Sequence, residues 1–166
     1  MALTKITGSG IGTVTNQFSD SNMPAGSVVQ TVFGTYDTQV SNTTSTYADT
    51  GLTATITPTS SSNKILVTVM QNGVYKDGSA EAGCRIQLVR DSTAISQLSK
   101  RAGGDNGTGT AATMSIGTVG ASILDSPNTT SATTYKTQFL SASNASSVYV
   151  QVYTCDSTII LQEIVV

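Results

Sequence analysis

The sequence predicts an all-β protein, an antiparallel β-sandwich of jelly-roll type with an extended N-terminal arm. Short apolar runs, several of them alternating with polar residues, recur along the chain between Gly, Asn, Asp and Pro. No window has the 3.6-residue period of an amphipathic helix. Nearly a third of the residues are Ser or Thr, and β-branched Thr favours strands. This pattern indicates about eight or nine short strands joined by turns, as in a sandwich.

Residues 1–26 are predicted to form the arm and residues 27–166 the sandwich domain. The arm contains a glycine-rich segment, residues 8–16, and ends in the turn formers of residues 20–26. The glycines do not follow a strand or open a helix, so a phosphate-binding loop is disfavoured. We expect this arm to dock on a partner through its apolar side chains, which are Leu3, Ile6, Ile11, Val14, Phe18 and Met23.

The first strands are predicted from clear alternation. Residues 27–36 are β-like, and residues 52–57 alternate cleanly up to Pro58, with Leu52, Ala54 and Ile56 facing inward. Residues 65–70 are apolar on both faces, which predicts a central strand or one covered by a partner. Asn72-Gly73 then predicts a tight turn.

The middle of the chain predicts a hairpin. Cys84, Ile86 and Leu88 alternate with polar residues, residues 90–92 turn the chain, and residues 93–98 return it. A glycine-rich loop follows at 100–110, and residues 111–125 supply one or two more strands. The two cysteines, Cys84 and Cys155, are too few for a disulfide scaffold and are expected to be buried thiols.

The last strands carry the candidate contact residues of the domain. Tyr135, Thr137 and Phe139 share one face of their strand. In residues 148–153, valines occupy one face, and Tyr149, Gln151 and Tyr153 occupy the other. Outward tyrosines suit protein contacts or stacking on sugars, and a second apolar face inside the sandwich is the equal alternative.

The C-terminal strand is apolar on both sides. Ile159, Leu161 and Val165 share one face, while Ile160, Ile164 and Val166 share the other. An exposed strand of this kind would aggregate, so it is expected to lie centrally in a sheet or against another subunit. Ile160 and Ile164, with Tyr149 and Tyr153, complete the set of candidate partner-binding residues.

Composition argues against most chemistry. The chain contains no histidine, so catalytic sites that use a histidine base are excluded, and no catalytic residue is assigned. A net charge of −2 argues against nucleic acid, and the apolar runs are too short for a membrane span. Residues 105–109 could ligate calcium, but an ordinary turn is favoured and no metal or cofactor is expected. No apolar secretory segment follows Met1, so a cytoplasmic origin is expected.

Several segments resemble virion structural proteins of tailed bacteriophages, of the head decoration or fibre type found in marine phages and cyanophages. They are the opening residues 1–12, the Met-Pro-Ala-Gly-Ser-Val run at 23–28, the strand and Pro-Thr-Ser loop leading to Lys-Ile-Leu-Val at 52–67, and the closing residues 160–164. The resemblance spans the chain, and its motifs are structural. It implies a β-sandwich on the outside of a virion, often trimeric, and supplies no catalytic residue.

These observations together predict a non-enzymatic virion surface protein, a capsid decoration or cement protein or a short head-fibre subunit. It would form a homotrimer and bind the major capsid protein or another virion protein through the arm. It would assemble in the bacterial host cytoplasm and stabilise the particle by mass action. The alternative is a receptor-binding module of a tail fibre, in which the loops at 41–48 and 100–110 and the tyrosines contact host glycan.

Overall fold

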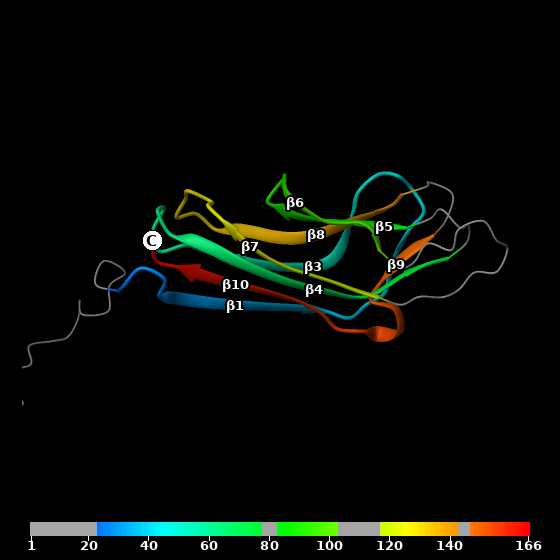
Figure 1. The fold of residues 1–166 in the computed structure, drawn as a ribbon, viewed down its shortest axis with the longest axis horizontal. Coiled ribbons are helices and arrows are strands. Elements are labelled where there is room, and N and C mark those ends of the chain that lie inside the picture. The colour runs from blue at the N-terminus through cyan, green and yellow to red at the C-terminus, as the bar shows by residue number, and fades with distance from the viewer. Residues whose placement is uncertain (1–22, 78–82, 103–116, 143–146) are drawn as a thin grey trace, which may run out of the picture.

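Two antiparallel β-sheets pack face to face in the computed structural model of the protein (Figure 1). The structure describes residues 23–77, 83–102, 117–142 and 147–166. Its elements are β1 (Val28–Tyr36), β2 (Val40–Asn42), β3 (Ala48–Ile56), β4 (Lys64–Lys76), β5 (Cys84–Arg90), β6 (Thr93–Ala102), β7 (Gly117–Asp125), β8 (Thr133–Ser141), β9 (Val148–Val150), the 3₁₀ turn η2 (Val152–Thr154) and β10 (Ser157–Ile164). One sheet has the order β1-β10-β4-β9-β2, with β7 also paired to β4, and the other has the order β3-β8-β5-β6. The predicted antiparallel β-sandwich is confirmed.

The eight longer strands pair as a jelly roll. The chain behaves as one long folded hairpin: β1 pairs with β10, β3 with β8, β4 with β7, and β5 with β6. Wrapping this hairpin places β10 beside β4 and β8 beside β5. The result is two four-stranded layers, β1-β10-β4-β7 and β3-β8-β5-β6, as expected for that fold.

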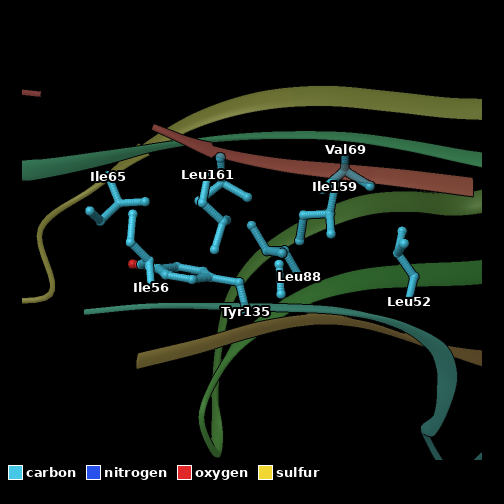
Figure 2. Close-up of a cluster of buried hydrophobic side chains, with 10 residues drawn as sticks. Leu52, Ile56, Ile65, Val69, Leu88, Tyr135, Ile159 and Leu161 are labelled. Atoms are coloured by element: carbon cyan, nitrogen blue, oxygen red, sulfur yellow. The ribbon is translucent and has the colours of Figure 1, made fainter. Parts of the chain in front are cut away.

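The main hydrophobic cluster lies between the two layers (Figure 2). β10 and β4 contribute from one sheet and β3, β5 and β8 from the other, because alternate residues of each strand point inward. The ring of Tyr135 lies among Ile56, Ile65 and Leu161. The buried members are Leu52, Ala54, Ile56, Ile65, Val67, Val69, Leu88, Tyr135, Ile159 and Leu161.

A second, smaller cluster lies further along the sandwich. Its members are Val74, Cys84, Ile86, Phe139, Val148 and Val150. Burial in this apolar setting raises the pKa of the Cys84 thiol to about 12, so the group stays protonated at neutral pH. Cys155 is also a free thiol but is only half-buried, so the expectation of two buried thiols holds for Cys84 alone.

A chain of buried polar side chains lies where the two clusters meet. Thr50 and Thr137 hydroxyls are 2.6 Å apart, and Thr137 donates to Gln71 Oε1 at 2.8 Å. Gln71 Nε2 donates to Ser157 Oγ at 2.9 Å, which also accepts from Gln151 Nε2 at 3.1 Å. These five residues are buried and come from both sheets. Directional bonds of this kind fix how the sheets are aligned.

The carboxylate of Glu163 on β10 is fully buried and surrounded by donors. Oε1 accepts from the Thr59 amide at 2.8 Å, the Thr59 hydroxyl at 2.7 Å, the Ser60 amide at 3.3 Å and Asn63 Nδ2 at 2.9 Å. Oε2 accepts from Gln30 Nε2 at 2.6 Å. Burial alone would raise the pKa of Glu163, but these bonds outweigh it and hold the pKa below its ordinary 4.5. The carboxylate thereby joins β1, β10 and the β3–β4 turn.

A third polar group connects the layers at the edge of the core. Arg90 at the end of β5 pairs with Asp125 at the end of β7 at 2.7 Å, and the Tyr135 hydroxyl donates to the same carboxylate at 2.7 Å. Burial, reinforced by Asp125, raises the pKa of Tyr135 well above its usual range. The hydroxyl of this core tyrosine is therefore hydrogen-bonded although its ring lies in the hydrophobic cluster.

Most strand predictions are confirmed. Leu52, Ala54 and Ile56 face inward on a strand that ends before Pro58, and Tyr135, Thr137 and Phe139 are fully buried. Asp91-Ser92 closes the β5–β6 hairpin, with Asp91 at φ 52°. The residue 65–70 segment and the C-terminal strand are both central, since β4 lies between β10 and β7, and β10 between β1 and β4.

Besides the expected burial of Cys155, three predictions of turns and strand ends were wrong. Asn72-Gly73 is no tight turn: β4 continues to Lys76, and Gly73, at φ 60°, lies in a bulge against Val152. The strand predicted over 148–153 stops at Val150, because Gln151 turns left-handed and is buried instead of facing out. The loop predicted from residue 100 starts later, since β6 continues to Ala102.

Replacing Thr137 by valine should destabilise the fold. Valine keeps the shape but leaves Thr50 and Gln71 each without one buried partner, so we expect a loss of about 1–3 kcal/mol in the free energy of unfolding, measured by urea denaturation. Thr134→Val on the same strand is the matched control, because its hydroxyl pairs with Thr55 at the surface. Equal losses in the two variants would contradict a structural role for the buried chain.

Stability should fall with acid through Glu163. Since the folded pKa lies below 4.5, its contribution is complete above that pH and is lost as the pH falls through 4.5 to the folded value. Glu163→Ala should cost about 2–3 kcal/mol at pH 7, because it strands several buried donors. Glu163→Gln keeps an acceptor but does not titrate, so its deficit relative to the native protein should shrink between pH 7 and pH 3. A deficit that stays constant over this range would refute the assignment.

Candidate functional site

The outer face of the β1-β10-β4-β7 layer carries no charge in its three central rows. Each row runs across the four strands in register. The rows are Thr35, Thr158, Met70 and Gly120; Phe33, Ile160, Thr68 and Ser122; and Thr31, Gln162, Leu66 and Leu124. We call these rows the uncharged face. A fourth row, which contains Val28 and Ile164, ends at Lys64 and marks its border.

Large apolar side chains on this face are open to solvent. Phe33 is 59 % exposed, Leu124 is 53 % exposed and Met70 is 42 % exposed. They come from three different strands, and Ile160 and Leu66 lie between them. Contiguous exposed apolar surface is uncommon on proteins that act as monomers and is typical of contact surfaces.

The outer face of the other layer provides an internal comparison. There Lys136 pairs with Asp49 at 2.8 Å, and Gln138 donates to the same carboxylate at 2.8 Å. Gln87 in turn donates to Gln138 at 3.0 Å. That face is charged and hydrogen-bonded, as solvent-facing strands usually are. The two outer faces therefore differ in charge. The low overall charge of the chain does not explain this difference, because both faces belong to the same chain.

The structure describes five of the ten predicted contact residues: Met23, Tyr149, Tyr153, Ile160 and Ile164. Ile160 and Ile164 lie on the outer side of β10, Ile160 on the uncharged face and Ile164 in its border row. Met23 is half-buried at the start of the described chain. Leu3, Ile6, Ile11, Val14 and Phe18 lie outside the described residues, as do the other arm residues before Met23 and the candidate calcium segment 105–109.

Sequence reasoning missed four apolar members of the face, Phe33, Leu66, Met70 and Leu124, of which all but Leu66 are exposed. The available signal was the apolar pattern on both faces of residues 65–70, because it predicted that one face packs in the core and the other contacts a neighbour. Neither Phe33 nor Leu124 could be recognised from its own segment. The strand register is needed to place Phe33 at the β1 end of one row and Leu124 at the β7 end of the next row.

Three tyrosines gather at one end of the same sheet. Tyr75 on β4 and Tyr149 on β9 are cross-strand partners, and their rings stack with centroids 5.6 Å apart and an interplanar angle of 23°. Val74, Val148 and Val150 fill the second core cluster, so the two tyrosines point to the outer side. Tyr153, on η2 directly after this strand, is 70 % exposed.

The backbone that carries Tyr153 is strained. Gln151, Tyr153 and Thr154 have φ values of 54°, 57° and 57°, a left-handed conformation that costs non-glycine residues about 1–3 kcal/mol each. Bonds to the sheet hold it: the Gln151 amide donates to Asn72 O at 3.0 Å, and Asn72 Nδ2 donates to Asp156 O at 2.6 Å. Val152 packs so closely on Gly73 that a β-carbon there would collide with it.

Within the described segments, no group of three or more Cys, Asp or Glu side chains is placed to hold a metal ion. Over the same residues, there is no helix with the length and hydrophobicity that a bilayer-spanning segment requires. The surface features that the described residues do offer are therefore the uncharged face and the tyrosine end.

No family model matches the chain, and no curated protein matches it either. The bacteriophage resemblance therefore rests on the sequence motifs alone.

Proposed function

We propose that the protein is a non-enzymatic structural subunit that assembles through its uncharged face. The observation that carries the proposal is the three-row surface with exposed Phe33, Met70 and Leu124. A surface without charge gains little from contact with a charged partner, because the partner's charges would lose water without compensation. A second copy of this chain supplies a matching uncharged surface at equal concentration.

A homotrimer fits this surface. In a closed threefold arrangement each copy makes the same pair of contacts with its two neighbours, so every uncharged face is buried against them around a common axis. Interfaces of lasting assemblies are enriched in Phe, Met and other large apolar side chains at their centre, with charged residues depleted there. Lys64 at the border row would lie on the rim.

We further propose that the assembled subunit belongs to a bacteriophage virion surface, as a capsid decoration, cement or short head-fibre protein. This setting rests on the resemblance of residues 1–12, 23–28 and 160–164 to such proteins. A jelly roll with one face reserved for neighbours suits that role, because binding to the shell stabilises the bound state by mass action.

Charged substitutions on the face should break the trimer. Phe33→Asp and Leu124→Asp each place a carboxylate among apolar neighbours, and we expect the midpoint concentration for dissociation to rise about 10-fold or more. Light scattering coupled to size-exclusion chromatography measures this as a shift from three times 17.0 kDa towards the single-chain mass. Both side chains are exposed in the single chain, so its fold should be retained.

Ala94→Asp is the matched control, since Ala94 is an exposed strand residue in the β3-β8-β5-β6 layer. This variant should remain trimeric. A native protein that stays monomeric at high concentration, or a Phe33→Asp variant as fully assembled as Ala94→Asp, would refute assembly through the uncharged face.

The arm provides a separate test of the virion setting. Deleting residues 1–22 removes none of the described sandwich, so the variant should fold and assemble but fail to bind phage particles in a co-sedimentation assay. Full binding by the truncated protein would refute docking through the arm, and antibody labelling of intact particles in electron micrographs would show where the native protein lies.

A further inference from the structure

We propose that Tyr75, Tyr149 and Tyr153 form a binding site for a neutral carbohydrate chain at one end of the sandwich. This inference does not depend on assembly through the uncharged face. It rests on the stacked rings of Tyr75 and Tyr149, on the exposed Tyr153 of η2, which directly follows β9, and on the strained segment that presents Tyr153.

The three phenols and one carboxylate share a neighbourhood. Tyr75 and Tyr149 are stacked, and η2 packs on the part of β4 that precedes Tyr75. Desolvation and then the proximity of Asp77, Tyr149 and Tyr153 raise the pKa of Tyr75, which agrees with the close grouping. The site therefore offers aromatic surface together with hydroxyl and carboxylate groups that bond to hydroxyl-rich ligands.

The electrostatics favour a neutral sugar over an anionic one. Asp77 is exposed beside the tyrosines, while its neighbour Lys76 is only 4 % exposed. A phosphate or sulfate would meet a like charge there. The nearly parallel rings of Tyr75 and Tyr149 also do not surround a common point, as the cage for a quaternary ammonium group requires.

The strained segment prepares the site before any ligand arrives. A tyrosine loses little conformational freedom on binding, and a backbone already fixed in shape loses less still. Tyr153 is held in a left-handed conformation by residues that bond to β4, although a shorter or glycine-containing link would avoid the strain. Backbone strain that is retained at an exposed aromatic residue indicates that the residue has a binding role.

The position of the tyrosines suits contact with an outside ligand. Both ends of the described chain lie together, since Gly26 donates to Val165 O at 2.8 Å and Val165 donates to Ser27 O at 3.0 Å. β9 and η2 lie at the opposite end of the long axis (Figure 1). A subunit held near its N-terminus would present the tyrosines outward.

The test is a titration of the full chain with cellohexaose, maltohexaose and mannohexaose, with heparin hexasaccharide and choline as charged comparators. The chain contains no tryptophan, so binding can be followed by tyrosine fluorescence, and the tyrosine variants show which of the six tyrosines give the change. We expect at least one neutral oligosaccharide to bind, and Tyr153→Ala and Tyr149→Ala to raise its Kd about 10-fold or more. Tyr47→Ala, which removes a tyrosine of the other layer, should leave the Kd unchanged.

A further variant separates binding from stability. Tyr153→Gly relieves the left-handed strain, so it should raise Tm by about 2–4 °C while it weakens binding as much as Tyr153→Ala does. If Tyr153 had only a structural role, this substitution would not raise Tm while it weakens binding. The proposal is overturned if no neutral oligosaccharide binds, if choline or heparin binds in their place, or if Tyr153→Ala binds as the native protein does.

Discussion

The placement of β10 between β1 and β4 is the constraint on which the rest of the structure depends. The strand uses both of its faces, since Ile159 and Leu161 fill the main cluster while Ile160 lies on the uncharged face. A strand that is apolar on both sides favours association wherever one side is left exposed. The jelly-roll pairing covers one side with the second sheet and leaves the other side, with its neighbours on β1, β4 and β7, as outer surface.

Polar groups determine where β10 lies along its neighbours. Apolar contacts tolerate sliding, whereas hydrogen bonds to a buried group do not. At one end of the strand, Glu163 accepts from Gln30 and from the turn around Thr59. At the other end, Ser157 accepts from Gln71 and Gln151. A slip of one residue would leave both groups unpaired and would exchange the inward and outward sets. The same bonds therefore determine which isoleucines face outward.

The sequence was sufficient for the architecture because the fold follows from alternation. The inward residues of β3 and β8 could be predicted from spacing alone, whereas the two-sided apolar pattern of β10 allowed either a central position or a covering subunit. The Asn72-Gly73 error has a physical reason: the pair favours a turn locally, but pairing with β7 and β9 on both sides of it keeps β4 extended, and the glycine instead admits Val152. Phe33 and Leu124 could not be assigned to one surface, because register is a property of paired strands and is absent from any single segment.

The two ends of the sandwich differ in how their order is maintained. At the end of the sandwich near Val165, both carboxylate oxygens of Glu163 accept hydrogen bonds from neighbouring donors. Near the tyrosines, the backbone keeps three unfavourable conformations and is retained by Asn72 and by the close approach at Gly73. The polar chain from Thr50 to Gln151 connects the first residue of this strained segment to both sheets. A stable jelly roll thus supports an exposed aromatic segment that would not hold its shape alone.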